Sequence, residues 1–163
     1  MVSRTYKVAD IAFRIKTDLP EPKAYKPFAT EEPADCAFTL EVVEGCDVEG
    51  MLAGLEKVGR FNEEAPYIWI YRGDAENGTD TYRVGFSLSP QRPYSLLEMS
   101  MDGLENRVYL ASGLDVREME NSVGNAVMLL YARVGADHDT MLIHSSTVVD
   151  SEGCGYAFLG KSG

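Results

Sequence analysis

The chain has 163 residues, of which 45% are hydrophobic and 25% are charged. This length suits one domain, or one domain with part of a second, and this composition suits a folded globular protein, so a large multidomain enzyme and a disordered chain are both excluded. The formal net charge is −11, from 26 acidic and 15 basic side chains. A field of that sign repels a phosphate backbone, which argues against nucleic acid as a partner.

Export signals and membrane spans are not evident in the sequence. The N-terminus lacks the uninterrupted apolar segment of an export signal, and no stretch approaches the ~18 apolar residues that cross a bilayer. We therefore expect a cytoplasmic protein with no membrane partner. Cys36, Cys46 and Cys154 are widely spaced and odd in number, and only His138 and His144 could join them in a ligand set. The sequence thus predicts neither a disulfide scaffold nor a metal site.

Alternating apolar and polar residues predict strands in the first third of the chain. Residues 6–15 alternate with one slip at positions 9 and 10, which is typical of a strand that carries a β-bulge. A polar segment with prolines follows at 18–33, and residues 36–42 predict a second strand. Apolar residues at helical spacing over 51–58 suggest one short helix, weakened by nearby glycines.

A β-meander is predicted from residue 67 to residue 111. Its strands cover 67–72, 81–89, 96–101 and 107–111. The pairs Asn77-Gly78 and Asp102-Gly103 favour tight hairpin turns, because these residues adopt the positive φ angles that such turns need. Trp69 and the tyrosines of these strands are expected to pack in the core and across strands.

One long amphipathic helix is predicted for residues 115–135. Its apolar residues recur at steps of three and four and form one stripe: Val116, Met119, Val123, Val127, Leu130 and Val134. We expect Met119 and Met128 to fill the core.

Two apolar runs, at 141–149 and 156–159, flank a short polar link with glycine and predict a β-hairpin. The expected class is therefore α+β: an antiparallel β-rich N-terminal region, the helix, and the hairpin.

The hairpin leads directly into Gly160-Lys161-Ser162-Gly163. A strand that ends in a glycine-rich turn is typical of the entry to a P-loop, G-x-x-x-x-G-K-[ST], whose backbone N–H groups and lysine bind phosphates and whose Ser/Thr holds Mg²⁺. Only the first glycine and three variable positions of that pattern are present. Lys161 is not the motif lysine, because it directly follows the first glycine.

Residues 141–163 resemble the entry to the nucleotide-binding core of the HPr kinase/phosphorylase family, which has a phosphoenolpyruvate-carboxykinase-like fold. In that family a strand with a histidine near its start pairs with a strand that leads into a G-x-S-G-x-G-K-[ST] loop. The resemblance implies that Gly160, Ser162 and Gly163 belong to the nucleotide-binding loop, with Lys161 at a variable position. It also makes His144 a candidate catalytic residue beside the phosphates. The alternative for His144 is a buried histidine hydrogen-bonded to a neighbour.

The resemblance implies a β-rich region at 1–112 and the start of a nucleotide-binding domain at 113–163. The whole would be a kinase that uses ATP and Mg²⁺ to phosphorylate a hydroxyl of a protein, peptide or small molecule. We expect the 163-residue chain itself to be inactive and to bind neither cofactor, because the motif lysine and the metal ligands would follow Gly163. An uncovered hairpin edge would favour self-association.

The alternative function is a complete, non-enzymatic binding module with an acidic surface. Residues 21–80 carry 14 acidic and 5 basic side chains, so most of the negative charge lies in this part of the chain. Such a surface serves solubility or attracts a basic partner.

Overall fold

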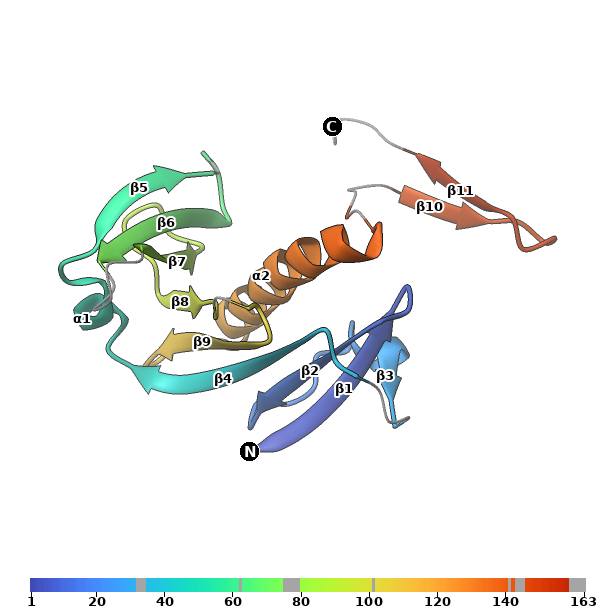
Figure 1. Ribbon diagram of the computed structural model, residues 1–163, viewed down its shortest axis with the longest axis horizontal. Coiled ribbons are helices and arrows are strands. Elements are labelled where there is room, and N and C mark those ends of the chain that lie inside the picture. The colour runs from blue at the N-terminus through green and yellow to red at the C-terminus, as the bar shows by residue number, and fades with distance from the viewer. Residues whose placement is uncertain are drawn as a thin grey trace.

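The computed structural model describes residues 1–31, 35–61, 63–74, 80–100, 102–140, 142 and 146–158. Its main body is a nine-stranded sheet that curves around the long helix α2, and a two-stranded hairpin projects from this body (Figure 1). The strands of the main sheet are β1 (Val2–Val8), β2 (Ile11–Thr17), β3 (Ala29–Thr30), β4 (Phe38–Cys46), β5 (Glu56–Arg60), β6 (Tyr67–Asp74), β7 (Asp80–Ser87), β8 (Ser95–Glu98) and β9 (Glu105–Ala111). The other elements are η1 (Lys26–Phe28), α1 (Val48–Leu52), α2 (Val116–Gly135), η2 (Ala136–His138), β10 (Ser146–Val149) and β11 (Gly155–Phe158).

The strand order of the main sheet is β3-β1-β2-β4-β9-β8-β7-β6-β5. The predicted α+β class, with a mostly antiparallel sheet and one long helix, is confirmed. The sheet departs from the expected antiparallel pairing at one strand, because β4 runs parallel to both of its neighbours, β2 and β9. Parallel neighbours are joined by long connections, which local alternation does not reveal.

The N-terminal alternation belongs to two strands, and the predicted bulge is wrong. β1 and β2 pair antiparallel, with Val8 opposite Ile11, so Ala9 and Asp10 form a two-residue turn between them. Both turn residues have positive φ, 44° and 67°, as a type I′ hairpin turn requires. The slip in the alternation therefore marks a reversal of the chain.

The predicted helix over 51–58 is shorter and begins earlier. α1 starts after Asp47, whose carboxylate accepts a 2.9 Å hydrogen bond from the Gly50 amide as an N-cap. Gly54 then adopts φ +83°, a left-handed conformation that ends helices, and β5 follows at Glu56. Val58 therefore lies in a strand, on the edge of the sheet.

The meander is confirmed: β6, β7, β8 and β9 pair antiparallel in sequence order. Gly103 has φ +76° in the β8–β9 turn, whereas Asn77 and Gly78 lie outside the described residues. Trp69 is 1% exposed, which agrees with its expected place in the core, and its ring lies 5.8 Å from that of Tyr67.

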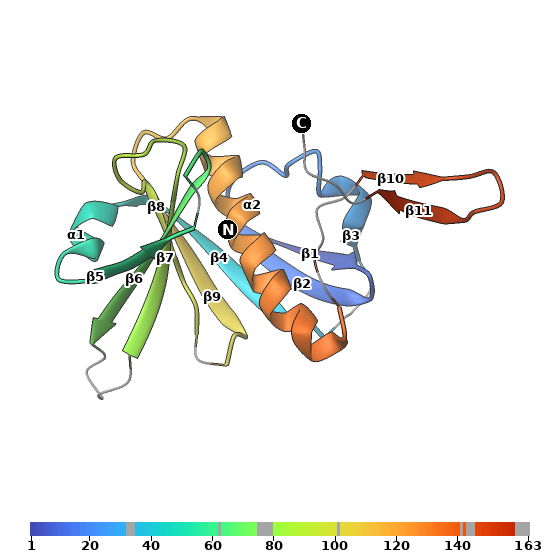
Figure 2. The same ribbon diagram turned by 90° about the horizontal axis from the view of Figure 1, so that it is seen from above.

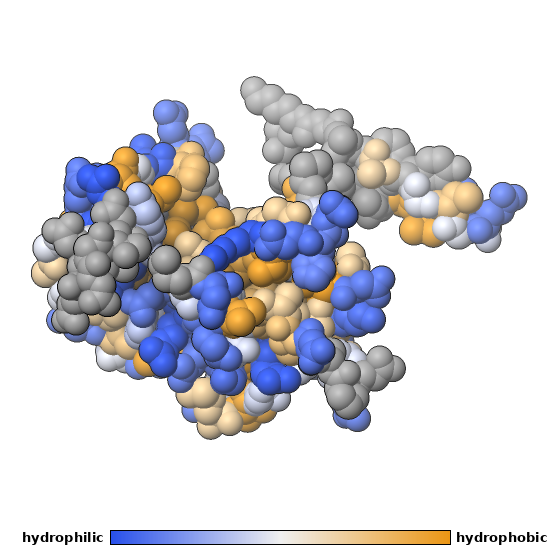
Figure 3. Space-filling view, in the orientation of Figure 1, coloured by the Kyte–Doolittle hydropathy of each residue, from blue (hydrophilic) through white to orange (hydrophobic). Residues whose placement is uncertain are grey.

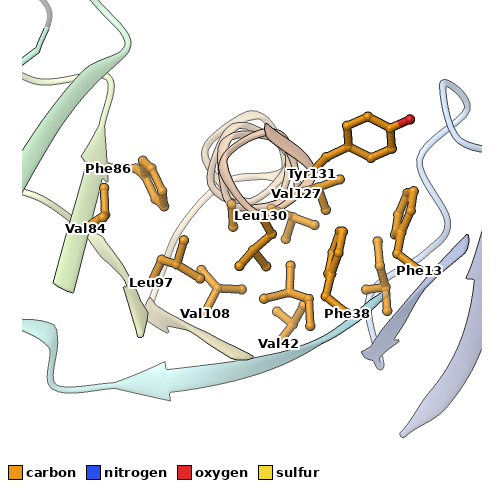
Figure 4. Packing of buried hydrophobic residues seen from close by; sticks show 14 of the residues in the cluster. Phe13, Phe38, Val42, Val84, Phe86, Leu97, Val108, Val127, Leu130 and Tyr131 are labelled. Atoms are coloured by element: carbon orange, nitrogen blue, oxygen red, sulfur yellow. The ribbon is translucent and has the colours of Figure 1, made fainter. Parts of the chain in front are cut away.

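Helix α2 lies across the concave face of the sheet and closes its core. A capping box begins the helix, since Asp115 accepts from the Glu118 amide and Glu118 accepts from the Asp115 amide. Val127 and Leu130 point from the helix onto the apolar side chains of the sheet, and Tyr131 extends sideways from the helix above Phe13 (Figure 4). Labelled sheet residues in this cluster are Phe13, Phe38, Val42, Val84, Phe86, Leu97 and Val108.

Two apolar residues of the helix that were expected to face the core are exposed. Val116 is 61% exposed and Met128 is 45% exposed, so the expectation that Met128 fills the core is wrong. Met128 follows Val127 directly, and one step along a helix turns a side chain by about 100°, away from the buried face. Met119, in contrast, packs against the core as predicted.

The three cysteines all lie in described segments, and no disulfide joins them. Among the helices that the structure describes, none is both long enough and apolar enough to cross a membrane.

Candidate functional site

The predicted C-terminal hairpin is confirmed. Strands β10 and β11 pair antiparallel with Val149 opposite Gly155. The Asp150 carboxylate organises the turn, because its Oδ1 accepts hydrogen bonds of 2.9 Å from the amides of both Glu152 and Cys154. Gly153 supplies the positive φ, +83°, that the chain needs to reverse.

The hairpin stands apart from the main sheet. It forms a separate sheet of two strands, and the ribbon shows it projecting beyond the end of α2 in both views (Figures 1 and 2). Val148 and Val149 are 57% and 66% exposed, and consecutive strand residues point to opposite faces. Hydrophobic residues are accordingly visible on the surface of the hairpin (Figure 3). An isolated two-stranded hairpin is at best marginally stable in water.

The residues predicted for the nucleotide site lie outside the described part of the chain: His144, Gly160, Lys161, Ser162 and Gly163. The structure does describe their flanks. β10 begins two positions after His144, and β11 ends two positions before Gly160. A strand therefore precedes residues 160–163, while the phosphate loop itself stays a prediction.

No cluster of three His, Cys, Asp or Glu side chains that could hold a metal ion is found among the described residues. Cys154 is exposed in the hairpin turn, where its amide is held by Asp150.

A second candidate site, which the sequence did not indicate, is an apolar cavity of about 60 Å³ beside the N-terminal end of α2. Its floor is formed by Ile15, Val42 and Val123, which are 3%, 4% and 6% exposed. The segment after β2 forms one wall; it passes close to the first turns of α2 (Figure 2). The sequence predicts this segment only as a polar, proline-containing stretch after the first strand.

Several polar groups of the cavity wall already have partners. The Tyr6 hydroxyl donates to Glu21 Oε1 at 3.1 Å, and burial, followed by this carboxylate, raises the pKa of Tyr6 to about 12. Tyr25 packs with its ring 5.4 Å from that of Tyr6, and burial raises its pKa to about 12 as well. Arg4 Nη1 donates to the Leu19 carbonyl at 3.4 Å. Both phenols are therefore neutral at physiological pH.

A larger, polar cavity of about 520 Å³ lies at the β7–β9 side of the sheet. Two of its arginines are paired across strands: Arg83 with Glu98 at 2.8 Å and Arg107 with Glu41 at 2.9 Å. Cross-strand ion pairs of this kind are typical of a solvated sheet face. Arg83 and Arg107 of this cavity are therefore already engaged by carboxylates of the protein itself.

Comparisons with protein-family models, characterised proteins and solved structures give no match to this chain.

Proposed function

We propose that this chain is the N-terminal part of an HPr kinase-like phosphotransferase that uses ATP and Mg²⁺, and that the β10–β11 hairpin opens its nucleotide-binding domain. The observation that supports this most is the hairpin itself, a separate sheet with apolar residues on both faces. Its second strand ends two residues before Gly160. The acceptor would be a hydroxyl of a protein, peptide or small molecule.

The exposure of Val148 and Val149 fits this proposal. The sheets of nucleotide-binding α/β domains are covered by helices on both faces, and their strands are apolar on both sides. The hairpin has this character, whereas the nine-stranded sheet has its helix on the concave face (Figure 1). A hairpin that packs against further strands and helices in the whole protein would expose apolar residues on both faces when those elements are absent, as this hairpin does.

The loop residues would act through their backbone. Gly160 and Gly163 allow amide groups to point inward at phosphate oxygens, and Ser162 takes a variable place in the loop. His144, before the first strand, would position or deprotonate the acceptor hydroxyl. Phosphoryl transfer depends mainly on positioning and charge neutralisation. The described residues include no set of metal ligands, so we assign no role in Mg²⁺ binding to them.

Calorimetry with Mg-ATP tests the proposal on two proteins. One is the 163-residue chain, and the other is extended along the natural coding sequence past Gly163. We expect micromolar binding only for the extended protein, and its loss in a Gly163→Val variant. Gly124→Val is the matched control, because a side chain at Gly124 on α2 meets no atom within 4 Å. Micromolar binding to the 163-residue chain, or a coding sequence that does not continue as x-Gly-Lys-[ST], would contradict the proposal.

We also propose that the 163-residue chain self-associates through its hairpin. In the described structure β10 and β11 pair only with each other, which leaves an outer edge on each strand. Sedimentation should show association that grows with concentration, weakened by Val149→Lys. A monodisperse monomer at high concentration would instead favour the alternative, a self-sufficient binding module.

A further inference from the structure

We propose that the apolar cavity beside α2 binds an aliphatic side chain of a protein or peptide partner, and that basic residues flank this side chain in the partner. The cavity belongs to the main body of the molecule. The proposal therefore does not depend on nucleotide binding.

The size and chemistry of the cavity suit a branched aliphatic group. Its volume of about 60 Å³ is several times the roughly 10–15 Å³ that one water needs. The floor of Ile15, Val42 and Val123 offers no hydrogen bond, and the Tyr6 hydroxyl is already engaged by Glu21. Water gains little in such a site, so an apolar group displaces it favourably.

The wall of the cavity is preformed. The Leu19 amide donates to Thr17 Oγ1 at 3.0 Å, and the Tyr25 amide donates to the Pro22 carbonyl at 3.0 Å. Pro20 and Pro22 further restrict the backbone of this wall. A site whose conformation is set before binding costs little entropy to occupy, so even a single side chain can bind measurably.

The mouth of the cavity presents an exposed apolar surface next to a negative charge. Val116 lines the cavity at the first turn of α2 and is 61% exposed, so its side chain is accessible to a partner. Glu120 also lines the cavity, one turn further along the helix. Arg4 is the cation among the lining residues, and Glu21, which accepts from the Tyr6 hydroxyl of the wall, places a second carboxylate beside the cavity. Together with the net charge of −11, this arrangement favours a partner with positive charge beside its aliphatic residue.

The test uses the 163-residue chain with ¹³C-labelled methyl groups and three capped peptides: acetyl-Lys-Leu-Lys-amide, acetyl-Lys-Ala-Lys-amide and acetyl-Glu-Leu-Glu-amide. We expect the basic leucine peptide to shift the methyl resonances of Ile15, Val42 and Val123 in a saturable way. The alanine peptide should bind roughly tenfold more weakly, because it buries fewer methylene groups. The acidic leucine peptide should bind more weakly than the basic one, and salt should reduce this difference.

Two variants of exposed helix residues separate the cavity from the rest of the surface. Val116→Gln should weaken the binding of the basic leucine peptide severalfold, because it replaces the apolar side chain at the mouth of the cavity with a polar one. Met128→Gln, at an exposed position of the same helix that does not line the cavity, should leave binding unchanged. Neither change disturbs a buried residue, so folding is preserved. The proposal would be overturned if the basic leucine peptide shifted only methyl resonances outside the cavity, if the leucine and alanine peptides bound with equal affinity, or if the two variants had equal effects. If the acidic and basic leucine peptides bound with equal affinity, the charge preference would be overturned.

Discussion

The hydroxyl of Tyr131 donates a 2.9 Å hydrogen bond to the carbonyl oxygen of Val8, a residue 123 positions earlier in the chain. Tyr131 is 5% exposed, and its ring forms a T-shaped pair with that of Phe13 at a centroid distance of 6.3 Å. The bond joins the last turns of α2 to the end of β1, beside the Ala9–Asp10 turn. The first and last elements of the main body thus stabilise each other.

Tyr131→Phe should lower the free energy of unfolding by about 1 kcal/mol, since it removes a hydrogen bond and keeps the ring packing. Urea denaturation measures this change. Tyr82→Phe, at a position that is 47% exposed, is the matched control and should change stability by less. Equal effects of the two substitutions would mean that the bond to Val8 does not stabilise the protein.

A chain that ends at residue 140 should keep a cooperative unfolding transition, whereas one that ends at residue 112 should not fold. The reason is that Val123, Ala126, Val127 and Leu130 of α2 are all at most 6% exposed and belong to the core of the sheet. Circular dichroism and thermal melting of the two truncations distinguish these outcomes. A folded 1–112 fragment would place the boundary before α2, where the sequence predicts it.

Ala9→Asn should raise the stability by roughly 0.5–1 kcal/mol. Ala9 has φ +44°, a region that costs an alanine energy and that asparagine tolerates better. The expected gain corresponds to a rise in melting temperature of a few degrees. Ala136→Asn is the control, because Ala136 has φ −60° and should gain nothing. A lower melting temperature for Ala9→Asn would contradict the strain argument.

Local patterns in the sequence predicted the elements that depend on local chemistry. The period of three and four residues located α2, and Gly103 marked a real turn of the meander. The turn at Ala9 and Asp10 was missed, because these residues lack the usual Asn-Gly signature and one shift in alternation fits a bulge as well as a reversal. The parallel pairing of β4 joins strands that lie far apart in the sequence, so no local pattern predicts it.

The two candidate sites differ in how far the sequence could reveal them. A phosphate loop is a contiguous motif, so its first half at 160–163 can be recognised without a structure. The apolar cavity combines Arg4, Ile15, Val42 and Val123, whose positions in the chain share no period. Only the folded arrangement of sheet, wall and helix brings them together.

The protein should lose stability between about pH 10 and pH 12. Burial, followed by the hydrogen bond to Glu21, raises the pKa of Tyr6 to about 12, and burial raises the pKa of Tyr25 to about 12. Unfolded tyrosines ionise near pH 10, so above that pH the folded state retains protons that the unfolded state has lost. The contribution of these groups is fully present below pH 10 and falls as the pH rises. Tyr6→Phe should make alkaline denaturation less steep, and an unchanged pH profile would contradict this assignment.

Asp115→Ala should lower the stability by about 1 kcal/mol, because the Asp115 carboxylate accepts the 2.8 Å hydrogen bond that satisfies the Glu118 amide. Arg117→Ala, an exposed change in the same turn, is the control. Hydrogen exchange should locate the added opening in the first turn of α2. Because Val116 and Met119 of this turn line the apolar cavity, fraying of the turn should also weaken the binding of the basic leucine peptide. A cap variant that lost stability but bound the peptide unchanged would show that this turn forms no essential part of the cavity wall.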